Sequence, residues 1–255
     1  MTTHLRPSDL GTILSVWAHP DDETYLAGGL MAAAADAGQR VVCVSATAGE
    51  LGTDDPATWP PDRLAAVRRW EAAASMAVLG VADHRWLGHR DGSLATVERR
   101  VAVGQIAKLI IDVDPDTIIT FGPDGMTFHP DHRVVSSWVG EARDRTGTAA
   151  RLLHATTTTT QIELWGDLYE RWGVFMTDER PTASPAPDLA VHLALHGAVL
   201  DRKVAALLAM HSQTAPAVAL MGMDTFRAQN AVEAFVDADR VRRQATAHRR
   251  VALVT

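Results

Sequence analysis

Two short clusters of ionisable residues carry the chemistry that this sequence suggests. The first is "HPDDE", from His19 to Glu23, which ends an apolar run, and the second is "HPDH", from His129 to His132. Adjacent carboxylates repel one another, so the first cluster needs a stabilising partner, and a metal cation would be one. His19 with Asp22, and His129 with His132, have the i, i+3 spacing that brings side chains to one side of a turn.

The side chains in these clusters are the ligands that catalytic metal sites use. Two imidazoles and one carboxylate, with a position left open for water, form the donor set of catalytic zinc. The same donors serve non-haem iron(II), so the residues alone leave both metals open. Each cluster taken singly is also consistent with an ordinary helix start, because proline and acidic residues are favoured in the first turn. The pairing of the two clusters predicts a metal site.

Short apolar runs alternate with helical patterns over the first 150 residues. Continuous β-branched runs are typical of strands buried on both faces of a parallel sheet. The alternation predicts an α/β fold, with a doubly wound, mostly parallel, Rossmann-like sheet that carries helices on both faces. Strands are expected at residues 12–18, 40–47, 84–88 and 116–122, and helices at 24–37, 62–80, 96–112 and after His132, with Asp62 and Gly80 as the caps of the second helix.

The pattern loosens beyond residue 150. Residues 152–160, which include five consecutive threonines, are expected to form a strand because threonine is β-branched. Residues 189–195 are expected to form another strand. Helices are expected at residues 197–210 and 232–250, the latter with a charged face. These elements predict a smaller C-terminal α/β extension of the sheet.

The length and composition fit one large domain. We expect a single domain over residues 1–255, with a core at 1–150 and C-terminal strands and helices at 151–255 that complete the site. The 31 acidic and 24 basic residues include no basic block for nucleic acid, and no apolar stretch is long enough to span a membrane. The single cysteine, Cys43, and the lack of a secretory leader pattern favour a cytoplasmic protein. The sequence leaves the oligomeric state open, a homo-oligomer included.

The expected sheet would bring the two clusters together. In open parallel sheets, ligands bind outside the carboxyl ends of the strands, where the strand order reverses. His19 follows the first expected strand directly, and His129 follows the fourth through a glycine-rich loop. In the common doubly wound order these two strands flank the crevice, so we expect the clusters to meet.

The clusters resemble those of the PIG-L/LmbE-like family of zinc-dependent de-N-acetylases, which remove acetyl groups from N-acetylglucosamine conjugates. The resemblance covers nearly all of residues 12–215. It implies that zinc binds His19, Asp22 and His132. It also implies that Asp21 is the general base, and that His129, oriented by Asp131, stabilises the oxyanion or acts as the acid. The matching segments are "AHPDDE", "TAGE", "VRRWEAAASMAVLGV", "LGHRDGSL", "TFGPDG", "HPDH" and "KVAALLAMHSQ".

These implied roles agree with general chemistry. Zinc polarises an amide carbonyl and lowers the pKa of its bound water toward about 7, so a nearby carboxylate suffices as base. Amide cleavage also needs a partner for the carbonyl oxygen and a proton for the leaving amine, which an imidazole can supply.

Further positions match the family less specifically. The resemblance implies that Arg68 and Asp91 hold sugar hydroxyls and that Glu50 and His211 line the substrate site. Each has an ordinary alternative: Arg68 can belong to a salt-bridged helix face, Asp91 to a turn, and His211 to a structural hydrogen bond. Glu23 is expected to brace its loop.

Several functions remain open at this stage. The first is hydrolysis of an acetylated amino-sugar conjugate, a small molecule, with a mycothiol-type conjugate as one candidate and a mycothiol-conjugate amidase as a variant. A second is a non-catalytic metal- or sugar-binding module, and a third is a phosphoesterase, which usually needs two metal ions. The presence of both Asp21 and His129 favours the enzyme. Thr127 and Phe128 depart from the small or aromatic-glycine step usual in the family, which leaves the acceptor group open.

Overall fold

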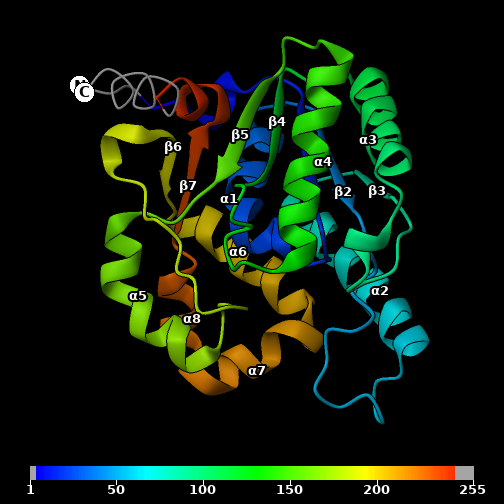
Figure 1. Cartoon of the computed structure of the whole chain (residues 1–255). Helices are drawn as coiled ribbons and strands as arrows, with labels where there is room; N and C mark the ends of the chain where they lie inside the picture. Colours follow the sequence, from blue (N-terminus) through cyan, green and yellow to red (C-terminus); the bar gives the residue numbers. More distant parts are fainter. Residues whose placement is uncertain (1–3, 245–255) are drawn as a thin grey trace, which may run out of the picture.

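The computed structural model of the chain describes residues 4–244, in which seven strands form one sheet (Figure 1). The strands are β1 (Ile13–Trp17), β2 (Val41–Ser45), β3 (Asp83–Trp86), β4 (Thr117–Phe121), β5 (Arg151–Ala155), β6 (Leu189–Ala194) and β7 (Val232–Asp237). Their order across the sheet is β3-β2-β1-β4-β5-β7-β6. The five strands β3, β2, β1, β4 and β5 are parallel to one another, whereas β7 runs antiparallel to both β5 and β6.

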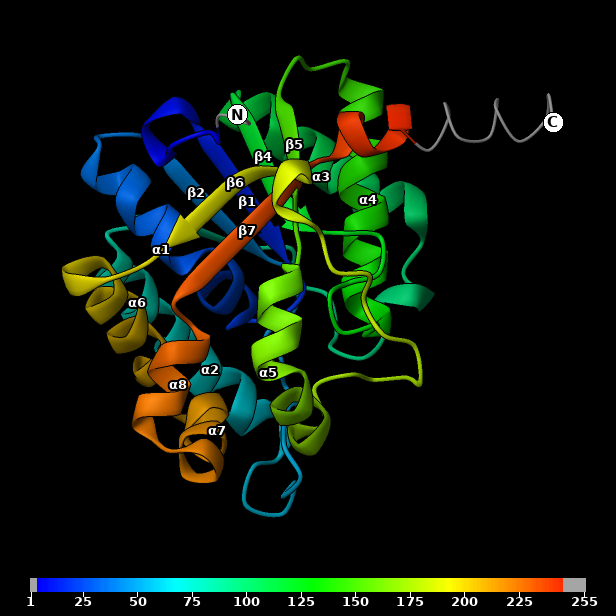
Figure 2. The ribbon, with the colours of Figure 1, turned by 90° about the vertical axis from the view of Figure 1, so that its left-hand side faces the viewer.

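Helices cover both faces of this sheet and one of its ends. They are α1 (Asp22–Asp36), α2 (Pro61–Leu79), α3 (Arg99–Val113), α4 (Pro130–Thr146), α5 (Thr159–Trp172), α6 (Gly197–Ala209), α7 (His211–Met221) and α8 (Met223–Gln229). Helices α3 and α4 pack together on one face, and α1, α2 and α6 pack together on the other. Helices α5, α7 and α8 gather at the end of the sheet where β5 leads into α5 (Figures 1 and 2).

The central strands are apolar because both of their faces are covered. Every residue of β1, β2 and β4 is buried, as the continuous apolar runs predicted. Strand β1 pairs with β2 on one side and β4 on the other, so the strand order reverses between β1 and β4. The predicted α/β fold with a doubly wound, mostly parallel sheet is confirmed, and the loops after β1 and β4 lie side by side.

Two expectations for the C-terminal part are wrong. The threonine run does not continue the strand, because Thr158 caps α5: its hydroxyl accepts from the amide of Gln161, whose side chain accepts from the amide of Thr158. Residues 232–237 are strand β7 and not the start of a helix, because their backbone pairs with β5 on one side and with β6 on the other. Residues 238–244 are helical, and 245–250 lie outside the described residues.

The second predicted helix, expected at residues 62–80, begins earlier than expected. Its N-cap is Pro60 and not Asp62, which lies within the first turn, where its charge favours the helix dipole. Gly80 ends the helix as predicted, in the left-handed conformation with φ of 79°, and its amide donates to the carbonyl groups of Met76 and Ala77.

Within residues 4–244, no single helix has both the length and the apolar character that a membrane crossing requires. Helices α6 and α7 meet those criteria only as a pair, and that pair is bent by 113°.

A buried ion pair ties the C-terminal elements to the core. Lys203 on α6 and Glu233 on β7 lie 2.8 Å apart, and both side chains are fully buried. The Lys203 ammonium also donates to the carbonyl of Tyr25, and the Glu233 carboxylate accepts from the amides of Gly29 and Leu30. These bonds join α6 and β7 to α1, which begins within the first cluster.

Removal of one partner should destabilise the fold, because the other would be left as a buried charge. We expect Lys203→Met to lower the free energy of unfolding by about 3–5 kcal/mol. Denaturant unfolding would measure it. Arg202→Met is the matched control, because the pair of Arg202 with Asp36 is partly exposed and should contribute about 1 kcal/mol or less. Equal effects of the two substitutions would contradict this account.

Candidate active site

The loop after β1 places His19, Asp21 and Asp22 at the carboxyl end of the sheet. The amide of His19 donates to the Asp22 carboxylate at 2.8 Å, which closes the turn into α1. Asp21 has φ of 124° and ψ of −35°, a conformation that L-residues rarely adopt. The fully buried Glu23 carboxylate accepts from the amide of Asp21, as a brace for this loop would. Such strain persists only where surrounding contacts fix it, and it is common at active sites.

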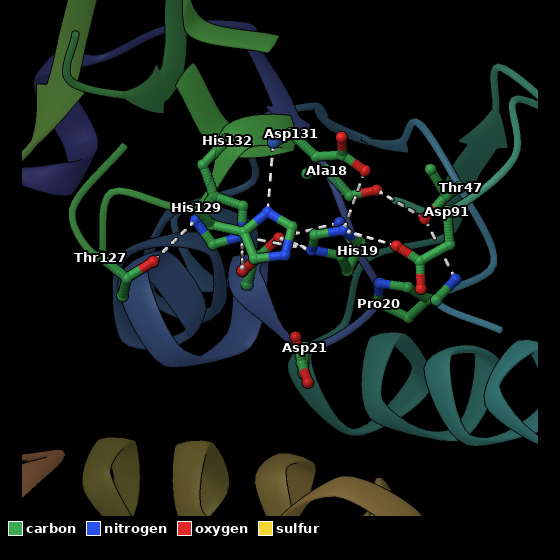
Figure 3. A network of polar contacts seen from close by, with 12 residues as sticks. Ala18, His19, Pro20, Asp21, Thr47, Asp91, Thr127, His129, Asp131 and His132 are labelled. Carbon is green, nitrogen blue, oxygen red and sulfur yellow. Dashed lines mark hydrogen bonds and ion pairs between the residues drawn. The ribbon is translucent and has the colours of Figure 1, made fainter. Parts of the chain in front are cut away.

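The loop after β4 positions the second cluster. Met126 and Phe128 have φ of 65° and 62°, so this loop is also held in left-handed conformations that non-glycine residues seldom adopt. His129 caps α4, and His132 lies one turn further on, where its ring stacks on that of Phe121 at 4.1 Å. The structure therefore brings the two predicted clusters together (Figure 3).

Three side chains face one another with their donor atoms close together. Nδ1 of His19 lies 3.2 Å from Nε2 of His132. One Asp22 oxygen lies 3.5 Å from the His19 nitrogen, and the other lies 3.3 Å from that of His132. Two donors bound tetrahedrally to one zinc ion at about 2.0–2.1 Å are roughly 3.3–3.4 Å apart. The spacing of these donors fits a zinc site.

The hydrogen-bonding surroundings of His132 and His19 also fit a metal ion. Nδ1 of His132 donates to the carbonyl of Gly125 at 3.0 Å, which leaves the Nε2 lone pair directed at His19. On the far side of His19, Nε2 is buried without a regular hydrogen bond, although the Asp91 carboxylate lies 3.0 Å away. A carboxylate behind a metal-bound imidazole is a common supporting contact.

Two neighbouring groups could also be considered as metal clusters, and their existing contacts argue against both. Donor atoms of His19, Asp91 and Asp131 lie within 4.8 Å of one another. However, Asp131 already accepts from the amides of Gly92 and Leu94, and Asp91 from that of Leu51.

The second group contains His129 beside His19 and His132. Nδ1 of His129 accepts from the amide of Asp131 at 3.1 Å, so only Nε2 of that ring remains available. Asp22, whose oxygens face both other imidazoles, is the better third ligand.

The environment separates the two adjacent carboxyl groups of the first cluster. Burial raises the pKa of Asp21 to about 7 against the influence of Arg68, with the charge of Asp22 adding to the rise. Burial also opposes ionisation of Asp22, but the imidazoles of His132 and His19 outweigh it and hold the pKa of that carboxyl below its usual range. Asp22 is therefore suited to remain an anionic ligand, and Asp21 to exchange a proton near neutral pH.

His129 is arranged as a neutral donor. Burial, helped by the neighbouring His19, lowers the pKa of the His129 imidazole. Because Nδ1 accepts from the Asp131 amide, the proton of the neutral ring lies on Nε2. Asp131, which the family resemblance implies to orient His129, bonds to that ring through its main-chain amide. The Asp131 carboxylate holds the turn at Gly92 and Leu94.

A cavity of about 530 Å³ opens beside these groups. Its lining includes most of the site residues expected from the sequence: His19, Asp21, Asp22, Arg68, Asp91, His129 and His132. Asp131 and Glu50 lie outside the lining. The carboxylate of Glu50 accepts from the amide of Asp91. His211 is exposed and lies outside the lining as well, which argues against a substrate contact; Gln213 lines the cavity instead.

Arg68 is buried and is not part of a solvated helix face. Its guanidinium donates to the carbonyl groups of Gly49 and Pro20 and lies 3.1 Å from the Asp21 carboxylate. These bonds make Arg68 a positioning contact for Asp21.

The sequence reasoning missed the part of the cavity wall that α5 and the following segment provide. Gln161, Tyr169, Trp172 and Phe175 all line the cavity. The usable signal was the spacing of Thr158 and Gln161, which matches a capping box and predicts a helix start.

Comparisons with known proteins show the family to which the chain is similar. Residues 14–143 match the family model described as PIG-L, GlcNAc-PI de-N-acetylase. A relative from Acidothermus cellulolyticus, named 1D-myo-inositol 2-acetamido-2-deoxy-alpha-D-glucopyranoside deacetylase, is 33% identical over 235 residues, 80% of each chain. A relative of the same name from Kineococcus radiotolerans is 38% identical over 148 residues, which cover 47% of this chain and 41% of that protein.

The fold also resembles a solved structure, the N,N'-diacetylchitobiose deacetylase from Pyrococcus horikoshii. The TM-score is 0.61 at 22% identity, over 90% of this chain and 84% of the other. At this identity the likeness concerns the fold alone.

The donor geometry predicts which side chains hold a metal ion. We expect Asp22→Ala and His132→Ala to weaken zinc binding by at least about 100-fold, because each removes a donor. Asp21→Asn is the matched control, since it changes the adjacent carboxylate and should keep the metal. Metal content after dialysis would measure this. Equal loss in Asp21→Asn and Asp22→Ala would contradict the assignment.

Proposed function

The chain belongs to the PIG-L family of de-N-acetylases, and from this premise we propose that it hydrolyses the acetamide of an N-acetylglucosamine conjugate. The observation that carries the proposal is the triangle of donor atoms from His19, Asp22 and His132, with Asp21 and His129 lining the same cavity. Nucleophile activation and oxyanion stabilisation both need groups at these places.

The donor set supports zinc as the cofactor. A zinc ion held by His19, Asp22 and His132 would polarise the acetamide carbonyl and lower the pKa of a water molecule beside it. Iron(II) uses the same types of donors and remains the alternative metal.

The side chains of the protein perform the proton transfers. Asp21 takes a proton from the attacking water, and Arg68 holds the carboxylate in place for that step. His129 does not transfer a proton: its Nε2–H donates a hydrogen bond to the carbonyl oxygen as negative charge develops there. The leaving amine needs one proton, which Asp21 can return after it has accepted one from water.

The expected contacts of Arg68 and Asp91 with the sugar have less support than the metal site, because both side chains already contact groups of the protein. The guanidinium of Arg68 is bound to two carbonyl groups and to Asp21. The Asp91 carboxylate accepts from the amide of Leu51 and lies against His19. Both residues line the cavity, and the bonds of Arg68 use its two terminal nitrogens, whereas its Nε has no hydrogen-bond partner.

A non-catalytic binding module is the second candidate. Two features favour catalysis over binding alone: the half-buried, strained Asp21 and the neutral His129 with Nε2 free of an acceptor role. A binding protein needs neither a base with a pKa near 7 nor a donor at the reacting carbonyl.

Loss of the base or of the oxyanion donor should lower turnover and leave the metal bound. We expect Asp21→Asn and His129→Ala each to reduce kcat for acetate release by about 100-fold or more. Asparagine is similar in shape to aspartate and tolerates positive φ, so the fold should persist. Acetate release from methyl 2-acetamido-2-deoxy-α-D-glucopyranoside, with zinc content as the control, measures both variants. Near-normal kcat in either one would remove that residue from the mechanism.

The pKa of Asp21 predicts the acidic limb of the pH profile. Asp21 must be ionised to accept a proton, so kcat/KM should rise with pH through about 7. Arg68 lowers that pKa, so Arg68→Met should raise it and move the limb to higher pH. Arg69→Met is the matched control, because Arg69 lies over the ring of Trp86 and outside the cavity lining. A limb that stays in place or moves to lower pH in Arg68→Met would contradict the assignment.

A further inference from the structure

The cavity continues beyond the donor atoms into a part with a different character. We call this part the distal half; its wall contains Tyr25, Met126, Tyr169, Trp172, Phe175 and Met176. These side chains come from α1, from the loop after β4, and from α5 with the segment that follows it. Their rings and alkyl chains are apolar, whereas the residues around the donor triangle are ionisable. The Tyr25 hydroxyl is a polar exception, because it is buried without a hydrogen-bond partner, and Thr157, Gln229 and Asn230 also line the cavity.

The distal half lies directly beside the reacting groups. Tyr25 follows Asp22 by three residues on α1, so both side chains lie on one side of that helix. On the opposite wall, the amide of Met176 donates to the carbonyl of Thr127 at 2.8 Å. The Thr127 hydroxyl in turn lies 3.4 Å from Nδ1 of His132. A group attached to a sugar at the reaction centre would therefore reach these side chains.

Several polar side chains that line this half already have partners within the protein. Gln161 bonds to the amide of Thr158 and the carbonyl of Val232, and the hydroxyl of Thr156 bonds to that of Ser184. Glu233 is fully buried against Lys203. These groups have little capacity left for a ligand.

The aromatic rings, by contrast, present free surface. Tyr169 and Phe175 lie edge to face at 6.3 Å, and Tyr25 lies 6.5 Å from Trp172. All four side chains are only partly buried, although they line a cavity. Partly exposed rings that converge on one cavity offer contact area to an apolar ligand group.

We propose that the distal half binds an apolar aglycone, an aryl or alkyl group joined to the amino sugar. The inference rests on the proposed function, because it concerns the group that the sugar carries. It differs from the inositol in the names of the two curated relatives. Inositol is a polyol, and each of its hydroxyls would need a hydrogen-bonding partner. Gln161, Thr156, Glu233 and the Asn230 amide nitrogen are already bonded within the protein, so the unpaired Tyr25 hydroxyl serves one such group, whereas the rings offer a larger apolar area.

The test compares three α-glycosides of N-acetylglucosamine that differ only in the aglycone: methyl, phenyl and 1D-myo-inosityl. With the zinc-loaded protein, we expect the KM for acetate release to be about tenfold lower for the phenyl than for the methyl glycoside, as ring burial would give. The inosityl compound should be no better than the methyl one. A lower KM for inosityl than for phenyl would overturn the proposal, and so would equal values for methyl and phenyl.

Variants locate the effect in the distal half. Phe175→Ala and Trp172→Ala should each reduce the phenyl-over-methyl preference to about threefold or less, without a matching change for the methyl glycoside. Trp172 also packs against the cluster around Phe226, so Phe175→Ala serves if Trp172→Ala unfolds. Trp70→Ala is the control, because Trp70 is 79% exposed on α2 and should leave the preference unchanged. A preference that persists in Phe175→Ala would overturn the proposed location.

A binding measurement separates this inference from the proposed function. Calorimetry with phenyl and methyl 2-amino-2-deoxy-α-D-glucopyranoside, which have no acetamide to cleave, should show tighter binding of the phenyl compound. If no glycoside releases acetate but the phenyl compound still binds more tightly, the proposed function fails and the apolar subsite stands. If acetate is released but the phenyl compound binds no better, the subsite fails and the proposed function stands.

Discussion

The pairing of β1 with β4 is the constraint on which the site depends. These two strands lie side by side where the strand order reverses, and each ends in a loop that enters a helix. The register of β1 with β4 fixes the positions of both loops relative to each other. The His19 and His132 nitrogens thereby come within 3.2 Å although the residues are distant in the sequence. The contacts that surround these loops, from Glu23 beneath Asp21 to Gly125 behind His132, refine a position that the sheet has already set.

The electrostatic environment shifts the pKa values of two adjacent carboxyl groups in opposite directions. Asp21 and Asp22 are adjacent, yet Asp22 faces two imidazoles whereas the half-buried Asp21 lies beside a single guanidinium. The Asp22 carboxyl is held ionised, and burial raises the pKa of the Asp21 carboxyl to about 7. The strained backbone at Asp21 turns these neighbours in different directions, so the loop conformation is a condition for the separation.

The sequence was informative where local pattern and tertiary environment agree. Buried strands on both faces are apolar throughout, so the core sheet and the meeting of the two clusters could be predicted. Strand β7 could not be predicted, because residues 232–237 have no regular alternation of buried and exposed side chains, and their pairing with β5 and β6 depends on distant segments. Arg68 could not be placed either. Its position on a helix is local information, whereas its burial against Asp21 depends on a loop that lies far away in the sequence.

A crystal structure of the zinc-loaded protein, with anomalous data at the zinc absorption edge, would show directly which side chains bind the metal ion. The account predicts one anomalous peak within about 2.0–2.2 Å of Nδ1 of His19, Nε2 of His132 and an Asp22 oxygen, with Asp21 outside bonding distance. A peak bound instead by Asp91 and Asp131, or by Asp21 in place of Asp22, would contradict it.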